Sequence, residues 1–200
     1  MKMTRTYNQT ARARAAEETG LRIIRSAFEL QTERLTTEIS LEDVAIRAGV
    51  SVQTVLRRFG SKAELFQASL ELINSDIAEE RRAPSGDVPG AVRVLVDHYE
   101  KHGDFALLML AQEGSYDHVR QMSEMGKKMH RNWVAEVFGP FLPTGAEPHD
   151  AAIDLLVIAT DVYTWKLMRR DRGLSRDRTE QRINSLVTAV LAGITSAKEH

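Results

Sequence analysis

Groups that can hydrogen-bond to nucleic acid gather on one face of an expected helix over residues 51–59. Val55 and Phe59 are four residues apart, so both side chains lie on the side of this helix that faces a core. The opposite arc carries amide, hydroxyl and guanidinium groups, at Gln53, Thr54, Arg57 and Arg58. Such groups donate hydrogen bonds to base edges and to phosphate oxygens. The face therefore predicts either a DNA-binding surface or the solvated side of an ordinary helical hairpin.

This face belongs to the stretch from Ser40 to Lys62, SLEDVAIRAGVSVQTVLRRFGSK. The stretch is expected to form a short helix, a turn at Gly49-Val50 and a second short helix, which are the dimensions of a helix-turn-helix. Ser40 and Asp43 have the spacing of a capping box at the start of the first helix. Gly49 ends that helix because glycine adopts positive φ without strain, and Val50 fills the angle between the two helices.

The same segment resembles the DNA-binding domain of the tetracycline-repressor (TetR) family of bacterial regulators. The family pattern is matched in both helices, in both turns and at the start of the following helix, by Ser40-Leu41, Val44-Ala45, Ala48-Gly49-Val50-Ser51, Thr54-Val55, Phe59, Lys62 and Leu65. The resemblance covers residues 22–70, about a quarter of the chain. It implies an all-α protein with an N-terminal three-helix DNA-binding domain and a C-terminal helical domain for ligand binding and dimerisation.

The resemblance also implies roles for single residues. The helix that starts at Ser51 is the expected recognition helix in the major groove, and Gln53 and Arg57 are its expected base readers. Thr54 is expected to bind a phosphate, and Lys62 a phosphate beside the N-terminus of the next helix. The full expected set of DNA contacts is Ser40, Ser51, Gln53, Thr54, Leu56, Arg57, Arg58 and Lys62.

The sequence departs from the family pattern at four positions. Leu56 stands where the family usually has Tyr, which removes one phosphate-binding hydroxyl. Leu56 is expected to touch a thymine methyl or a sugar instead, and Arg57-Arg58 could supply the lost backbone affinity. The other departures, none of which breaks the expected fold, are Gln31, Leu35 and Ile39.

The rest of the chain is expected to be helical throughout. Apolar residues recur at helical spacing, and no stretch alternates apolar and polar residues as a strand does. The expected helices cover residues 15–34, 41–48, 51–59, 61–82, 90–102, 104–113, 117–138, 149–172 and 178–197. The expected parts are a flexible basic arm over 1–14, a DNA-binding domain over 15–75 with its helix-turn-helix at 40–59, and a ligand-binding and dimerisation domain over 76–200.

Charge is distributed unevenly, although the net charge is only −1. Residues 1–62 hold 11 Lys and Arg against 7 Asp and Glu, whereas residues 63–200 hold 16 against 21. A basic front on an acidic body indicates that only the front meets an anionic polymer. The arm is expected either to lie against DNA or to form a disordered tail. Its basic residues are Lys2, Arg5, Arg12 and Arg14.

The C-terminal helices carry two candidate surfaces. The last two, over 149–172 and 178–197, are apolar enough to need cover on more than one side. This favours a homodimer through a four-helix bundle over the alternative, in which both helices are simply the core of a monomer. A pocket for a small-molecule effector is expected among the middle helices, because methionine suits cavities that accept varied apolar molecules. Plain core packing is the alternative for each candidate lining residue. These candidates are Phe105, Met109, Met122, Met125, Met129, Trp133 and Trp165.

Other chemistries find little support. His98 and His102 lie four residues apart, a spacing that can hold a metal, but without an identifiable third ligand they are expected to be ordinary surface histidines. The chain has no cysteine, and it has no Gly-rich phosphate loop, nucleophile elbow or zincin motif, so neither a thiolate zinc site nor an enzyme is expected. No cofactor is expected either. The absence of a long apolar stretch or an apolar leader predicts a cytoplasmic protein that does not span a membrane.

The expected function is transcriptional regulation through double-stranded DNA. The first expectation is a repressor that binds a palindromic operator as a dimer and is released by a small apolar ligand. Two alternatives stay open: an activator of the same type, and a small-ligand carrier or interaction module with a vestigial DNA-binding head. Leu56 favours the carrier or interaction module, whereas Arg57, Arg58 and Lys62 oppose it.

Overall fold

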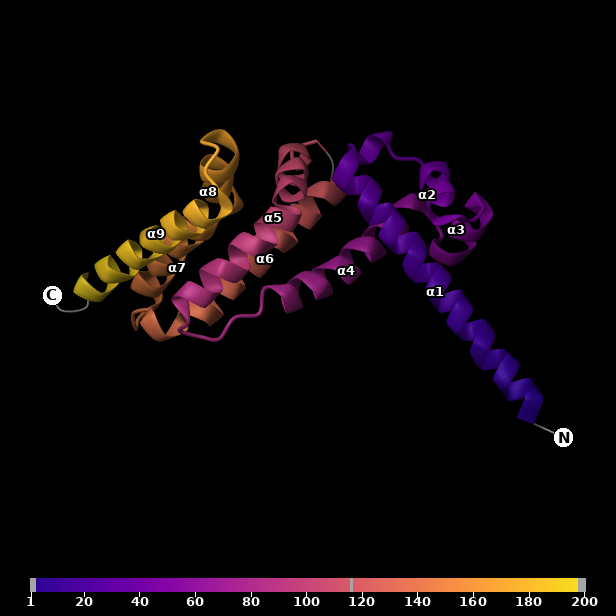
Figure 1. The fold of residues 1–200 in the computed structure, drawn as a ribbon, viewed down its shortest axis with the longest axis horizontal. Helices are drawn as coiled ribbons and strands as arrows, with labels where there is room; N and C mark the ends of the chain where they lie inside the picture. The colour runs from indigo at the N-terminus through magenta and orange to yellow at the C-terminus, as the bar shows by residue number, and fades with distance from the viewer. Residues whose placement is uncertain (1–2, 116, 198–200) are drawn as a thin grey trace. The chain divides into compact units, whose positions relative to one another are not determined.

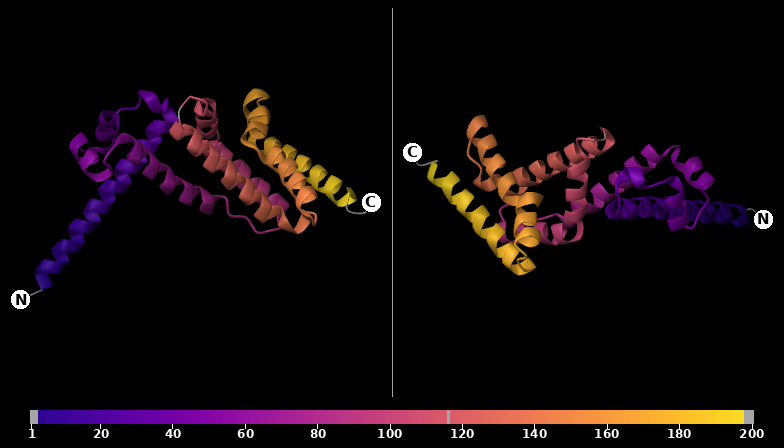
Figure 2. Two further views of the ribbon diagram at one scale, coloured as in Figure 1. Left: turned by 180° about the vertical axis from the view of Figure 1, so that it is seen from behind. Right: turned by 90° about the horizontal axis from the view of Figure 1, so that it is seen from above.

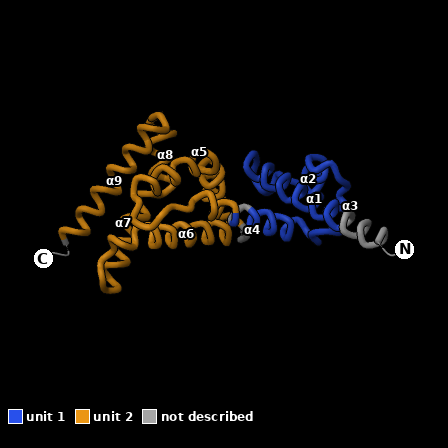
Figure 3. Tube along the Cα trace, turned by 60° about the horizontal axis from the view of Figure 1, so that its bottom comes forward, with its two compact units in different colours: residues 1–75 blue, residues 76–200 orange. Residues whose placement is uncertain are grey.

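The computed structural model describes residues 3–115 and 117–197, and this part of the chain is helical and contains no strand (Figure 1, Figure 2). None of its helices is both long and apolar enough to cross a membrane. The chain divides into two compact units, residues 1–75 and 76–200 (Figure 3). The all-α fold class expected from the sequence is confirmed.

The first unit is a small helical domain around the helix-turn-helix. Its elements are α1 (Met3–Glu33), the 3-10 turn η1 (Thr36–Glu38), α2 (Leu41–Ala48), α3 (Val52–Phe59) and α4 (Lys62–Glu80). The last turn of α4 already belongs to the second unit. Each helix buries one apolar face, as its sequence spacing requires. The core contains Ile23, Ala27, Leu30, Val44, Ala45, Val55, Leu65 and Phe66.

The second unit is a helical bundle. Its elements are α5 (Val88–Gln112), α6 (Asp117–Phe138), the 3-10 turn η2 (Gly139–Phe141), α7 (Ala146–Thr160), α8 (Val162–Lys166), the π-helical turn η3 (Leu167–Asp171) and α9 (Arg176–Ala197). Helix α5 packs against α6, α8 and α9, and α7 packs against α6 and α9. The largest side chains buried among these helices are Leu95, Phe138, Leu156, Trp165 and Ile183.

The first helix begins earlier than the sequence suggested. Helix α1 starts at Met3, so most of the segment expected as a flexible arm is helical. The segment has neither proline nor glycine, and its alanines and arginines are strong helix formers. Arg14 is exposed, whereas Lys2 and the side chains of Arg5 and Arg12 lie outside the described residues.

Helix α5 continues through Gly103, where the sequence pattern indicated a break. The reason is a tertiary contact, because the ring of Trp165 packs directly against this glycine. A Cβ at Gly103 would lie 2.6 Å from Cζ3 of Trp165. Gly103 therefore serves close packing inside a helix and does not end one.

The segment expected as one helix over 149–172 is divided at Asp161. Asp161 has extended backbone angles, φ −70° and ψ 153°, and its carboxylate accepts a hydrogen bond from the backbone N–H of Tyr163 at 2.8 Å. The carbonyl of Thr160 at the end of α7 accepts a hydrogen bond from the Tyr99 hydroxyl at 3.0 Å. The break is stable because both new helix ends have partners.

Candidate nucleic-acid interface and ligand pocket

Two serines cap the helices of the helix-turn-helix. Ser40 and Asp43 form a capping box, in which Asp43 N donates to Ser40 Oγ at 3.1 Å and Ser40 N donates to Asp43 Oδ2 at 2.7 Å. These bonds from Ser40 lower the pKa of the Asp43 carboxyl. Ser51 caps α3, because its Oγ accepts a hydrogen bond from Thr54 N at 3.2 Å. Both helix starts are therefore determined by local side-chain chemistry.

Two glycines set the limits of α3. Gly49 ends α2 with a left-handed φ of 65°, and Val50 N then donates to the carbonyl of Ala45 at 3.0 Å. Gly60 follows α3 with a φ of 79°. Because side chains other than glycine are strained at positive φ, these two positions fix the length and entry angle of α3.

Helix α3 presents the polar face that its sequence predicted. Val55 is fully buried and Phe59 packs partly buried against the same core. On the other side Gln53, Arg57 and Arg58 are exposed, and Leu56 is 41% exposed. Thr54 is half-buried, and its hydroxyl lies 2.9 Å from the hydroxyl of Ser51. The expected DNA contacts of α3 therefore share one short helix with an apolar anchor.

Two of the expected DNA-binding cations, Arg58 and Lys62, already contact other parts of the first unit. The Arg58 guanidinium lies against Gly20 of α1, where a Cβ would come within 2.3 Å of Nη2. Lys62 Nζ donates to the carbonyl of Thr36 at 2.8 Å, and partial burial lowers the pKa of this lysine. Among the described residues, Arg57 makes no hydrogen bond or ion pair. Arg57 is therefore the cation of α3 that is most available to a partner.

Helix α1 holds α2 in place through charged side chains. Arg22 Nε donates to the carbonyl of Ala48 at 2.8 Å, which satisfies a carbonyl at the end of α2. Arg47 of α2 forms two hydrogen bonds with Glu33 of α1, at 2.7 and 2.8 Å, and these bonds lower the pKa of the Glu33 carboxyl. Helix α3 is thus carried by a scaffold that polar contacts hold together as well as an apolar core.

A pocket of about 350 Å³ opens in the second unit. One stripe of α6 contributes Met125, Met129 and Trp133, three of the residues expected to bind a ligand. The remaining lining residues are Ala78, Arg81, Lys128, Asn132 and Glu136. The pocket therefore combines an apolar wall with two cations and one carboxylate.

The other four expected ligand-binding residues do not line this pocket. Trp165 is fully buried in the core, where its indole Nε1 donates to Glu100 at 3.0 Å. Met109 is buried as well, and Phe105 and Met122 are partly buried. Methionine and aromatic content alone did not separate the pocket from the core, because both use the same apolar side chains.

The most unusual lining residue is Arg81, a buried cation. Its Nη2 lies 2.7 Å from Nδ1 of His130, and its guanidinium carbon lies 4.6 Å from the centre of the Trp133 ring. His130 Nε2 lies 3.1 Å from the hydroxyl of Thr160. No described carboxylate pairs with Arg81, and its buried Nε has no hydrogen-bond partner. Burial lowers the pKa of Arg81, and burial together with this arginine lowers the pKa of His130 to about 3.

The sequence of residues 23–69 matches the family described as "Bacterial regulatory proteins, tetR family". These residues run from the core of α1 through α2 and α3 into α4, and so contain the complete helix-turn-helix. The first unit therefore carries a TetR-family DNA-binding domain. Such a domain is that of a DNA-binding transcription regulator. No curated protein sequence matches the chain.

Solved structures of other regulators share the fold over nearly the whole chain. A tetR-family transcriptional regulator from Streptomyces coelicolor is 17% identical, with a TM-score of 0.68 over 90% of this chain and 89% of that one. A transcriptional regulator from Rhodococcus sp. Rha1 is also 17% identical, with a TM-score of 0.66 over 87% and 96%. The flavonoid-responsive regulator FrrA is 19% identical, with a TM-score of 0.62 over 90% and 97%. The TetR fold thus extends through the second unit.

The second unit also contains a feature that contradicts the expectation of two surface histidines. His98 on α5 is only 7% exposed, and His102 is partly buried. The two rings lie 5.1 Å apart. The sequence spacing placed them on one face of a helix, but it could not show that this face points inward.

Several residues with structural roles were not found by sequence reasoning. Arg22 binds a backbone carbonyl that lies 26 residues away, and Gly20 meets Arg58 from another helix. Glu80 and Arg81 belong to the charged run Glu79–Arg82, which looks like a solvated helix end. No signal in the sequence distinguishes these residues, because the role of each depends on a contact with an element that is distant in the sequence.

Proposed function

We propose that this regulator is a repressor that binds a palindromic operator as a homodimer and is released by a small molecule. The observation that supports this proposal most is the exposed face of α3. Gln53 and Arg57 stand side by side there on a helix anchored by Val55. An amide and a guanidinium are the groups that pair with adenine and guanine through two hydrogen bonds.

In this proposal the eight expected DNA contacts divide by chemistry. Gln53 and Arg57 read base edges, while Leu56 touches a thymine methyl or a sugar. The remaining contacts are to the phosphate backbone and come from Ser40, Ser51, Thr54, Arg58 and Lys62. The hydroxyls of Ser51 and Thr54 already pair with each other, so only the hydroxyl that accepts within this pair keeps its proton to donate to a phosphate oxygen. Arg58 and Lys62 exchange an internal contact for a phosphate when DNA arrives.

The homodimer would form through α7, α8, η3 and α9. Large apolar side chains are exposed along these elements, at Leu155, Ile158, Tyr163, Leu167 and Leu186. The outer face of α9 adds small residues that allow a second helix to approach closely, at Ser185, Ala189, Ala192 and Gly193. A two-fold axis through this face buries the same residues from both subunits. The palindrome follows from that symmetry.

The proposed effector has an apolar or aromatic body and an anionic group. Met125, Met129 and Trp133 offer the apolar wall, and Arg81 offers a buried guanidinium without a carboxylate partner. A carboxylate or phenolate would supply the missing negative charge. To lower operator affinity about 100-fold, binding must favour the non-binding state by about 2.7 kcal/mol.

Selection of DNA from a random pool by the full-length protein tests the function. The expected result is a palindromic consensus, and binding to it should weaken by about 1–3 kcal/mol in Arg57→Ala, with relaxed preference at one position per half-site. Arg93→Ala, an exposed arginine of the second unit, serves as the matched control and should bind as the native protein does. Anionic aromatic compounds should release the complex in the native protein and not in Arg81→Met.

Absence of any enriched sequence would contradict the DNA-reading proposal. That result would favour the alternative in which the second unit is a ligand carrier or interaction module, to which Leu56 already points. If a palindrome is enriched but a reporter gene is activated and not repressed, the proposed operator binding stands and the protein is an activator.

A further inference from the structure

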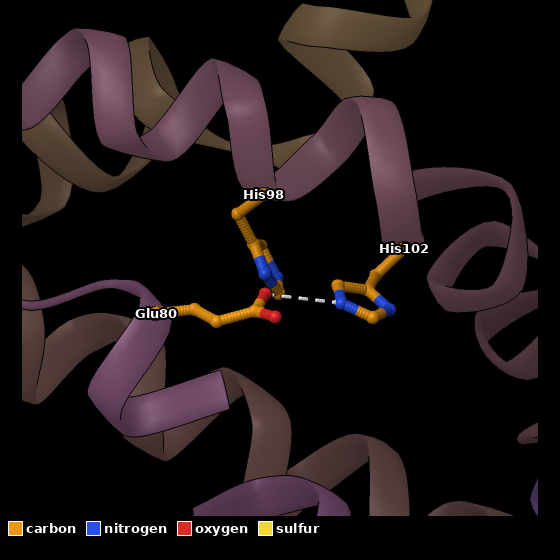
Figure 4. A group of neighbouring side chains, drawn as sticks. All are labelled: Glu80, His98 and His102. Atoms are coloured by element: carbon orange, nitrogen blue, oxygen red, sulfur yellow. Dashed lines mark hydrogen bonds and ion pairs between the residues drawn. The ribbon is translucent and has the colours of Figure 1, made fainter. Parts of the chain in front are cut away.

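Three side chains of the second unit bring metal-binding atoms together (Figure 4). Glu80 is the last residue of α4, and His98 and His102 stand one turn apart on α5. One ligand atom from each residue lies within 4.8 Å of those from the other two. Figure 4 shows the carboxylate and the two imidazoles pointing toward one another.

His98 has the environment of a ligand whose partner is missing. Its side chain is buried, and its Nδ1 has no hydrogen-bond partner among the described residues. A buried polar atom of this kind costs free energy unless something binds it.

The spacing of the donor atoms suits a small divalent ion. Zinc binds imidazole nitrogen at about 2.0–2.1 Å, so two donors of a tetrahedral site are roughly 3.3 Å apart. His102 Nε2 and Glu80 Oε2 already lie 3.2 Å apart. The donor atom of His98 lies within 4.8 Å of both. A small shift of the partly exposed Glu80 and His102 side chains toward His98 would bring all three donors to the spacing of a zinc site.

We propose that Glu80, His98 and His102 form a binding site for a divalent transition metal, with Zn²⁺ as the reference ion. Two imidazoles and one carboxylate are a ligand set that zinc uses, and three protein ligands leave one position for water or an exogenous group. The ion would join the end of α4 to α5. It would thereby hold the last turn of α4 against the second unit, while the rest of α4 belongs to the DNA-binding domain.

Two nearby cations, Lys101 and Arg81, could weaken metal binding at this site by repelling the ion. Lys101 Nζ lies 3.3 Å from Glu80 Oε1, and Arg81 follows Glu80 directly in the chain. The Lys101 side chain is 60% exposed, so it can turn into solvent when an ion takes its place. Arg81 points to His130 and the Trp133 ring and does not compete for the carboxylate. Removing the charge of Lys101 should therefore tighten metal binding.

The test is a titration of full-length, chelator-treated protein with Zn²⁺ alone, in competition with a chromophoric chelator. The native protein should bind one ion per chain. His102→Ala and Glu80→Gln should weaken binding at least about 10-fold, since even changes to residues that only orient a ligand cost 10- to 100-fold. Lys101→Gln should bind as tightly as the native protein or tighter. The exposed His149, changed to alanine, is the matched control and should leave binding unchanged.

Both test residues are partly exposed, so the variants should fold, and their circular dichroism spectra verify this. Substitution with Co²⁺ gives a second measurement, because four-coordinate cobalt absorbs strongly in the visible range and six-coordinate cobalt does not. The proposal is overturned if the native protein binds no ion. It is equally overturned if His102→Ala and Glu80→Gln bind as the native protein does, or if binding is lost in His149→Ala instead.

Discussion

Arg81 and His130 form a buried pair in which only the arginine is charged. In the neutral ring, His130 Nδ1 accepts a hydrogen bond from Arg81 and the Nε2–H donates to the Thr160 hydroxyl oxygen, while the ring stacks on Trp133 with a centroid separation of 5.8 Å. A protonated His130 would place two cations in a space that excludes water. The pair is therefore stable only while the imidazole is neutral.

This pair predicts a loss of stability in acid. The pKa of His130 is lowered to about 3 in the folded protein, whereas an unfolded histidine titrates near 6.5. Between these values the unfolded chain takes up a proton that the folded one does not. As pH falls below 6.5, His130 should therefore lower the free energy of unfolding by up to about 1.4 kcal/mol per pH unit.

Urea unfolding from pH 7.5 to 4.5 measures the effect. His130→Gln should lose less stability per pH unit than the native protein, because glutamine does not titrate and can still hydrogen-bond to Arg81 or Thr160. His149→Gln, at an exposed histidine, is the control and should keep the native slope. Equal slopes in all three proteins would contradict the prediction.

The exposed polar face of α3 could be predicted from the sequence, whereas the polar clusters of the second unit could not. Gln53 and Arg57 are defined by the local repeat of α3 and by two glycines. Arg81 and Glu80 become special only because α5 and α6 return to them from elsewhere in the chain. Local residue spacing predicts which side chains share a helix face, but it does not predict contacts between distant elements.

Two helical glycines illustrate how the same residue has opposite effects in different elements. Gly103 in α5 faces the Trp165 ring, with Cζ3 2.6 Å and Cη2 2.8 Å from where a Cβ would stand. Gly126 in α6 has no atom within 4 Å of that position. Replacing glycine by alanine favours the helix in both cases, so the surroundings decide the outcome.

Gly103→Ala should therefore destabilise the protein by about 1–3 kcal/mol, because a rigid ring in a filled core cannot move aside cheaply. Gly126→Ala should stabilise it by about 0.5–1 kcal/mol through the helix preference of alanine. Urea unfolding of the two variants beside the native protein measures both changes. A gain in stability for Gly103→Ala would show that the Trp165 contact does not constrain α5.

The helix boundaries show the same division. The capping box at Ser40 and the stop at Gly49 are local, and the sequence predicted them. The continuation of α5 through Gly103 and the break at Asp161 depend on Trp165 and on Tyr99, which lie on other elements. Sequence periodicity recognises helices well, but tertiary contacts decide where some of them end.

At the scale of the molecule, the exposed apolar face of α7 to α9 predicts a dimer that a single charge should disrupt. Ile158 is 64% exposed in the chain by itself. If it is buried between subunits, Ile158→Glu places an unpaired carboxylate there from each side. Since such a charge costs about 3–5 kcal/mol, the dimer dissociation constant should rise at least about 100-fold.

Sedimentation equilibrium measures that constant. Ile46→Glu is the matched control, because Ile46 is an isoleucine of α2 that is 75% exposed in the first unit. It should leave the oligomeric state unchanged. A dimer that is unaffected by Ile158→Glu would place the interface on another face of the second unit.

The short length of α3 limits how much information one subunit can extract from DNA. The eight residues of α3, Val52–Phe59, rise about 12 Å, which is the length of roughly three and a half base-pair steps. In the proposed dimer two copies would specify about seven base pairs, and a given sequence of seven base pairs recurs by chance once in about 16,000 base pairs. A genome of millions of base pairs holds hundreds of such sequences. Recognition of one operator among these chance matches requires further information, from contacts to flanking base pairs or from the shape of the duplex.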